Sequence, residues 1–257
     1  MKQPSSIFNS HEINKRMKSL NYPNTFMLTC YFTIASFCSF GQKTEINLNA
    51  YSGLFSYIGN GSTSSSKIIS GIFVKPFTAN TYGKNGAFSF SLETQVIKNT
   101  KTHFLYGIGL AYESLISRVR IDSVVFNGEV IRLIEPTFDA NGKTKLTNTY
   151  LNLNPFVGKR FIRGMLSFDV LTGIDLGLCL TSHEDGSATD TSKRVVVTNN
   201  DEPRPAIDFR PRIQLKAQYK KVGILFGYSF GLTNYQTTGN SKVYTNFLRM
   251  GLSYTIR

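Results

Sequence analysis

The 257-residue chain contains no tryptophan, three cysteines and three histidines, and charged residues make up only 18% of it. Cysteines this few exclude a fold held together by several disulfides and a site built from clustered cysteine ligands. The mean hydropathy of −0.13 excludes a bundle of transmembrane helices. Beyond the N-terminal segment, no stretch reaches the roughly 18 apolar residues that a membrane-spanning helix needs.

The chain is rich instead in aromatic residues and glycine, with 20 phenylalanines, 13 tyrosines and 21 glycines. Aromatic residues favour strands and glycine favours turns, so this composition predicts β structure with many turns. The length allows one large domain or two small ones. The sequence contains no phosphate-binding loop, nucleotide fingerprint or cysteine-based metal site, and we expect no cofactor.

The N-terminus has the pattern of an export signal. Basic residues in segment 15–18 precede an apolar run at 26–40, and the small residues Ser39 and Gly41 stand where a signal peptidase requires them. A basic segment, an apolar run and a small-residue cleavage site together define a secretory signal. We therefore expect residues 1–41 to be a signal peptide.

Cleavage at this point leaves a mature domain of residues 42–257. Met17 is an alternative start, because the segment before it is unusually long for a signal peptide. A membrane anchor is the competing interpretation, but the apolar run is short and contains Thr, Ser and Cys. Lipidation at Cys30 or Cys38 would give a lipoprotein, although neither follows a typical lipidation motif. Only Cys179 remains in the mature chain, so no intramolecular disulfide can form.

The formal net charge of +13 predicts that the protein lies against an anionic partner. Nucleic acid is not expected, because no basic cluster is interleaved with stacking aromatic residues. For an exported chain, the expected counter-charge is anionic lipid or lipopolysaccharide.

Segment 207–219, "IDFRPRIQLKAQY", shows the clearest pattern of the mature chain. Every second residue is apolar, and the residues between them are charged or amides. This alternation predicts a strand whose two faces meet different environments. The same pattern, more or less clean, predicts eight strands in all, at 44–57, 88–96, 104–113, 149–161, 168–181, 207–219, 222–233 and 248–256.

The connections between these strands alternate strictly between short and long. Tight turns are expected at 99–102, 162–163 and 220–221, and long loops at 58–86, 119–148, 182–205 and 236–243. Short periplasmic turns and long outside loops, with an even strand number, are typical of outer-membrane barrels. Thirteen residues tilted by roughly 40° also cover on the order of 30 Å of bilayer. The predicted fold is therefore all-β: an eight-stranded antiparallel up-and-down transmembrane β-barrel with long extracellular loops.

Aromatic residues gather near both ends of the apolar faces, as expected for the headgroup region. The periplasmic set is Phe104, Tyr106, Phe168, Tyr219 and Tyr254, and the outer set is Phe88, Phe90, Phe209 and Phe230. A soluble barrel with its apolar face inward is the alternative, since alternation alone does not decide which face points inward. Pro155 and Pro211 remove ladder hydrogen bonds, so a bulge or a strand end is expected at each.

The second half resembles a known family. The segments "TYLNLNPFVGKRF", "IDFRPRIQLKAQYKKVGILFGYSFGLTNYQ" and "LRMGLSYTIR" are similar to the PorT-like outer-membrane β-barrel family common in Bacteroidetes. "TYGKNGAFSFSLETQVIKNTKTHFLYGIGLAYESL" resembles its second hairpin, so the similarity covers about residues 44–257. The resemblance implies an eight-stranded outer-membrane barrel and no catalytic residues, with one branch tied to a secretion machinery. Arg257 departs from the terminal Phe of many barrels.

Charged residues on the faces opposite the apolar ones would point into the lumen. An eight-stranded barrel is just wide enough for side chains to fill it, so we expect these acids and bases to pair across the interior. A narrow ion path along the same residues is the alternative. The expected network comprises Glu93, Glu113, Asp169, Asp175, Asp208, Arg210, Arg212, Lys216 and Arg249.

Catalytic arrangements are weak in this sequence. Asp169 and Asp175 are six residues apart, about 20 Å along a strand, and therefore form no acid–base dyad. Segment 182–190 contains Ser182 and His183 with several acids, which allows a lipid hydrolase at the barrel rim, weak Ca²⁺ binding or a plain solvated loop. His103 and His183, the two mature histidines, are predicted to lie too far apart to share a metal.

We therefore expect a non-enzymatic outer-membrane protein of a Gram-negative bacterium, with a structural, binding or secretion and assembly role. The loops at 58–86, 119–148 and 182–205 would make its contacts. A narrow porin-like pore is the alternative, and a rim-located hydrolase a minor one. Expected partners are outer-membrane lipid or lipopolysaccharide, the barrel-insertion machinery and an extracellular or periplasmic protein.

Overall fold

The computed structural model describes residues 43–71, 74–127, 137–236 and 240–256, and these form β structure joined by turns. The predicted signal peptide at 1–41, with the alternative start at Met17, lies outside the described residues. No helix in the described part of the chain is long and apolar enough to cross a membrane.

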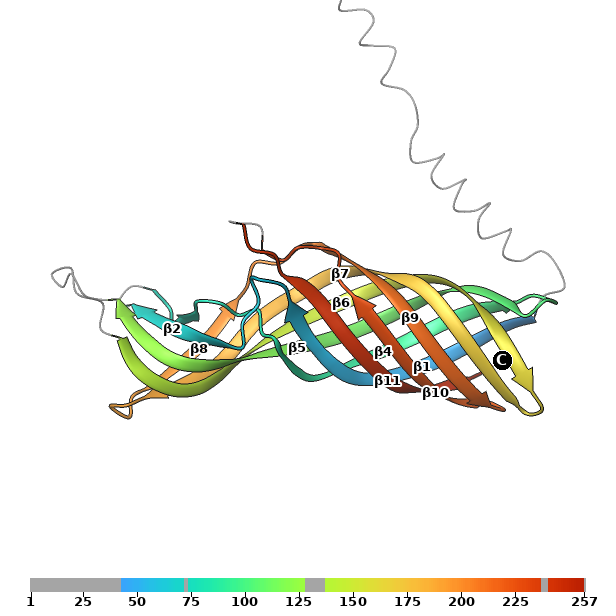
Figure 1. Ribbon diagram of the computed structural model, residues 1–257, viewed down its shortest axis with the longest axis horizontal. Helices are drawn as coiled ribbons and strands as arrows, with labels where there is room; N and C mark the ends of the chain where they lie inside the picture. Colours follow the sequence, from blue (N-terminus) through green and yellow to red (C-terminus); the bar gives the residue numbers. More distant parts are fainter. Residues whose placement is uncertain (1–42, 72–73, 128–136, 237–239, 257) are drawn as a thin grey trace, which may run out of the picture. The chain divides into compact units, whose positions relative to one another are not determined.

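Eight of the described strands form a closed barrel (Figure 1). Each pairs antiparallel with its two neighbours, and the ring closes because β1 pairs with β11 and β5 with β6. This confirms the predicted fold class. The barrel strands are β1 (Lys43–Ile58), β4 (Asn85–Asn99), β5 (Phe104–Asn127), β6 (Thr137–Arg163), β7 (Leu166–Asp190), β9 (Ile207–Tyr219), β10 (Val222–Phe230) and β11 (Tyr244–Thr255).

The barrel has its apolar side outside and its charged side inside. In β9 every charged or amide residue is buried, while the apolar residues between them face outward. Leu252 on β11 is 62% exposed, whereas the Arg210 side chain on β9 is completely buried. Most of the aromatic residues expected in the two girdles are exposed on the outer surface as well, including Phe88, Phe209 and Tyr254.

Above the barrel, β5, β6 and β7 continue well beyond the length needed to cross a bilayer; β6 alone has 27 residues. Three short strands join them: β2 (Ser65–Gly71), β3 (Phe77–Thr78) and β8 (Val195–Asp201). We call these six stretches together the extension. Figure 1 shows β2 and β8 beside the far ends of the long strands. The extension has its own apolar core, formed by Ile68, Ile121, Val124, Ala188 and Val196.

The extension corrects three predicted loops. Within 119–148, residues 119–127 and 137–148 continue β5 and β6, and within 182–205 residues 182–190 continue β7 while β8 forms beyond them. Segment 58–86 contains β2 and β3. The pattern was missed because it reverses: apolar residues face outward in the barrel and inward in the extension, since water replaces lipid outside.

Smaller expectations also differ. The β6–β7 turn is at Gly164 and Met165 rather than 162–163, and β10 ends at Phe230 rather than at 233. No bulge or strand end occurs at either proline. Pro155 lies at a gap in the β6–β7 ladder with no change of register, and Pro211 lies just beyond the last β9–β10 pair. Each proline therefore has a paired strand on one side only, and its missing N–H falls where the other ladder is interrupted or has ended.

Candidate functional site: the sealed lumen

The centre of the lumen is filled by a layer of three arginines and their acidic partners, which we call the central layer. Alternation along β9 turns Arg212 inward, where its guanidinium lies 2.9 Å from Glu93 and 3.2 Å from Asp175. Glu93 comes from β4 and Asp175 from β7, so Arg212 ties three strands together. All three side chains are nearly or completely buried.

Arg249 and Arg210 extend this layer. Arg249 lies 3.0 Å from Glu113 and 2.9 Å from Asp175, and therefore shares the latter with Arg212. Arg210 donates to the other oxygen of Glu113 at 2.6 Å and has Asp208 at 3.6 Å. The carboxylates thus link the three guanidiniums into one continuous network.

Aromatic and amide groups complete the central layer. The hydroxyl of Tyr51 donates to Glu93 at 2.7 Å and accepts from Arg212 at 2.8 Å. Arg212 lies over the Tyr51 ring and Arg210 over the Tyr150 ring, with 5.3 Å and 5.2 Å to the centroids. Such stacking suits a guanidinium that has lost its water.

A second charged layer lies nearer the tight-turn end. Arg160 on β6 makes paired hydrogen bonds to Glu45 at 2.7 and 2.9 Å and to Asp169 at 2.7 and 2.9 Å. Lys216 is 2% exposed, and its amine has no hydrogen-bond partner in the described part of the chain. Apolar side chains close the lumen at the same end: Ile97, Leu105, Phe156 and Leu171.

Aromatic side chains close the opposite end of the lumen. Tyr57, Tyr82 and Tyr235 pack edge to face, with ring centroids 5.1 to 6.3 Å apart. Tyr235 donates to Asp208 at 2.8 Å and hydrogen-bonds to Tyr150, which joins this aromatic plug to the central layer.

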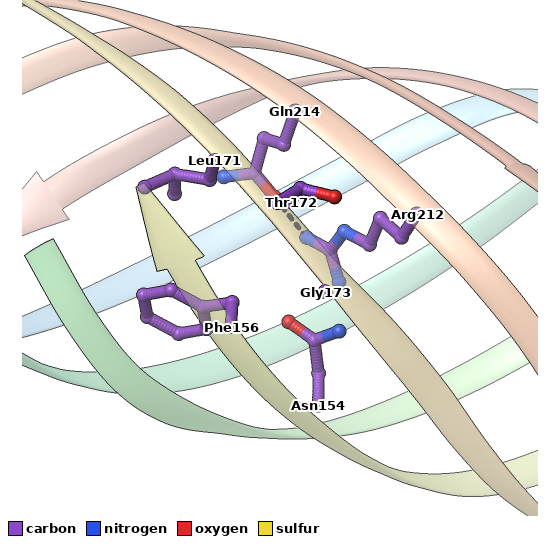
Figure 2. Close-up of a pocket in the computed structure, with 7 residues that line it drawn as sticks. All are labelled: Asn154, Phe156, Leu171, Thr172, Gly173, Arg212 and Gln214. Carbon is purple, nitrogen blue, oxygen red and sulfur yellow. Dashed lines mark hydrogen bonds between the residues drawn. The ribbon is translucent and has the colours of Figure 1, made fainter. Parts of the chain in front are cut away.

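The packing around Arg212 leaves no open passage at that point. Figure 2 shows Asn154 and Phe156 from β6 with Arg212 and Gln214 from β9 around the space between the strands. Arg212 donates to Gln214, and the gap they enclose has no room for a water molecule.

The structure brings most of the predicted lumen residues together. Glu93, Glu113, Asp175, Asp208, Arg210, Arg212 and Arg249 meet in the central layer, and Asp169 lies in the second layer. Lys216 makes none of the described ion pairs, although it was expected to pair with an acid.

Sequence reasoning missed Arg160, Glu45 and the tyrosines. Arg160 occupies an inward-facing position of β6, but Pro155 interrupts the alternation of this strand and obscures which residues face inward. Glu45 lies near the start of the described residues, where the alternation has barely begun. The inward tyrosines gave no signal, because their rings count as apolar in the alternation.

The geometry does not bring Ser182 and His183 together, as the hydrolase alternative requires. Ser182 and His183 are neighbours on strand β7 and therefore point to opposite faces. Ser182 is buried, whereas His183 lies 2.9 Å from Asp201 on the partly exposed side. No serine–histidine pair forms there. In the described residues, no three His, Cys, Asp or Glu side chains could hold a metal ion.

Two acids, the buried Glu184 on β7 and the partly buried Glu202 just after β8, lie close together at the extension. Glu184 is buried and accepts hydrogen bonds from the backbone and hydroxyl of Thr78 and from Asn200. Burial, together with the negative charge of Glu184, raises the pKa of Glu202 to about 7. Glu202 therefore keeps its proton until the pH approaches neutrality.

A closed barrel with a continuous apolar exterior and a charged, packed interior defines an integral membrane β-barrel. An apolar surface this extensive is stable only against lipid, and a closed barrel leaves no unpaired strand edge there.

The chain can be compared with solved outer-membrane proteins. Neisserial surface protein A is 8% identical, covering 82% of this chain and 98% of its own, with a TM-score of 0.35. Ail of Yersinia pestis is 10% identical, covering 83% and 97%, with a TM-score of 0.33. No protein-family model and no curated protein matches the chain. Since these TM-scores are low, the class rests on the strand pairing and burial described above.

Proposed function

We propose that this protein is a non-conducting, non-enzymatic barrel of the Gram-negative outer membrane that holds the extension at the cell surface as a binding platform. The observation that carries this proposal is the lumen, which two charged layers and an aromatic plug fill. The export signal expected at 1–41 and the short connections at one end support the placement, because outer-membrane barrels keep their short turns in the periplasm.

The extension supports a binding role. It is folded around its own core rather than left as flexible loops, and it continues the barrel wall through three unbroken strands. A rigid platform loses little entropy when a partner binds. The partner would be an extracellular protein or the surface lipid itself. The barrel-insertion machinery would place the barrel in the membrane. Membership of the PorT-like family of Bacteroidetes would account for the segments that resemble that family.

Ion flux tests the proposal. We expect proteoliposomes carrying the mature barrel to show no flux above that of empty vesicles, and planar bilayers to show no steady single-channel steps. Flotation and gel mobility of the same sample establish that the barrel is folded and inserted. Reproducible unitary conductance from inserted protein would instead support the narrow porin-like pore.

A further inference from the structure

A basic groove lies on the outward face of the extension. Its volume is about 470 Å³, and it is formed by β5, β6, β7 and β8. We call it the basic groove; its lining residues are Arg118, Lys143, Thr144, Lys145, Asp185, Gly186, Ser187 and Val197.

Like charges stand directly opposite one another along this face. The register of β5 and β6 pairs Arg118 with Lys145. The next pair on the same face of the sheet is Arg120 with Lys143. Like charges at directly opposed positions destabilise a sheet. Two consecutive pairs of this kind therefore cost the fold stability unless anions lie against them.

Among the described residues, acids compensate for only half of this charge. Lys145 lies 3.0 Å from Asp185, and Arg120 lies 2.7 Å from Asp122. Arg118 and Lys143 take part in none of the ion pairs of the described residues. Two cations of the basic groove are thus left to meet an external anion.

The height of the basic groove above the hydrocarbon core of the membrane indicates which anion it meets. Lys145 and Leu151 lie on the same face of β6, and Leu151 is the exposed apolar residue of this strand nearest to Lys145, at the edge of the apolar belt. Six residues at this tilt place Lys145 about 15 Å above Leu151. Phospholipid headgroups occupy only about 5–8 Å on each side of the hydrocarbon core. The basic groove therefore lies above simple headgroups, beside the first sugars of a surface glycolipid.

We propose that the basic groove binds phosphate groups on the core saccharide of an outer-leaflet glycolipid. This rests on the proposed function, since it requires the barrel to be in the outer membrane with the extension outside. Arg118 supplies a planar fork suited to two phosphate oxygens, and Lys143 and Lys145 supply point charges. Exposed Val195 and Val197 on β8 add an apolar border.

Binding to purified glycolipid tests the proposal. The folded, full-length mature barrel in detergent micelles is titrated with rough lipopolysaccharide that carries a phosphorylated core. The test variant is Arg118→Gln/Lys143→Gln/Lys145→Gln. The matched control, Lys43→Gln/Lys101→Gln/Lys221→Gln, removes the same charge from exposed positions at the tight-turn end.

We expect the test variant to raise the Kd at least about tenfold, because each basic side chain at an anionic surface contributes roughly 1 kcal/mol. The control should stay within about twofold of the wild type. Deep-rough lipopolysaccharide, which lacks the core phosphates but keeps those of the lipid anchor, should bind the wild type as weakly as rough lipopolysaccharide binds the test variant.

Three outcomes would overturn the proposal: equal weakening by both triple variants, equal binding of rough and deep-rough glycolipid, or equal binding of soluble dextran sulfate. The last would assign the basic groove to a free polyanion. Each of these leaves the proposed function standing if the variants still fold, insert and block ion flux, so the two proposals fail separately.

Discussion

At the residue scale, the buried arginines and the buried lysine of the lumen are in different situations. Arg212, Arg249 and Arg210 each contact carboxylates, and Asp175 serves two of them. Lys216 is equally buried but hydrogen-bonds to no described residue. Removing one member of a buried network leaves its partners charged and unpaired, whereas removing an amine without a partner relieves a desolvation cost.

Substitution by methionine separates these cases. We expect Arg212→Met to lower the free energy of unfolding by about 3–5 kcal/mol, because Glu93 and Asp175 lose a shared cation. Lys216→Met should be neutral or stabilising by about 1 kcal/mol. Urea unfolding of both variants in lipid vesicles measures this difference. Equal destabilisation by the two substitutions would contradict the distinction.

The raised pKa of Glu202 predicts a pH dependence of the extension. The pKa of Glu202 is raised from 4.5 to about 7 when the protein folds. A raised carboxyl pKa favours the folded state fully below pH 4.5, and this contribution is lost as the pH rises to 7.

The extension should therefore become less stable between pH 4.5 and 7, by about 1 kcal/mol because the carboxyl is partly open to water. Glu202→Gln should abolish this change and leave the extension more stable at pH 8. Hydrogen exchange of the Thr78 amide, corrected for the intrinsic rate at each pH, measures it. A wild-type protein whose corrected protection is flat over this range would disprove the assignment.

At the element scale, the long strands pass from lipid into water, and the polarity of their two faces reverses. Their outward residues are apolar in the barrel and polar in the extension. In β7 a register shift opposite Thr149 and Tyr150 accompanies the change, so odd-numbered residues such as Cys179 point inward below it and Ser182 and Glu184 point inward above it. The extra residue turns every following side chain to the other face. The strand therefore stays continuous while its apolar pattern does not.

Two neighbouring valines of β8 test whether the extension folds as a unit on the barrel. Val196 is buried in the core of the extension, and Val195 is 64% exposed. We expect Val196→Asp to cost the extension more than about 3 kcal/mol, because a carboxylate would be buried without a partner. Val195→Asp should have almost no effect.

Limited trypsin digestion of the folded protein provides the measurement. Cleavage after Arg194 should become fast in Val196→Asp and remain slow in Val195→Asp, while the barrel below stays intact in both. Loss of the whole barrel in Val196→Asp would show that the extension and the barrel do not unfold separately.

At the scale of the whole molecule, the main feature is that polar residues lie inside the barrel and apolar residues outside it, the reverse of a water-soluble protein. Charged networks fill the lumen and apolar side chains cover the barrel wall, so the folded protein needs lipid around it. We expect the native protein to fractionate with the outer membrane and to migrate differently on a gel before and after heating. Recovery in the soluble periplasmic fraction would contradict the placement.

The eight barrel strands and most of the central layer were predictable because alternation with a period of two survives wherever lipid lies on one side and packed charges on the other. The stretch 207–219 is the clearest case, and β9 has those bounds. The extension was not predictable in the same way. Its outward residues, such as Lys143 and Lys145, are polar, and its inward residues, such as Ile121 and Val124, are apolar. This is the reverse of the barrel.

The sequence by itself determined that the chain forms strands of membrane length with one charged face, since backbone geometry alone separates alternate side chains. Only the tertiary structure decided which charges meet. Arg212 reaches Glu93 across 119 residues of chain, and Arg160 reaches Glu45 across 115. Such partners are set by shear and closure of the ring, which depend on all eight strands at once.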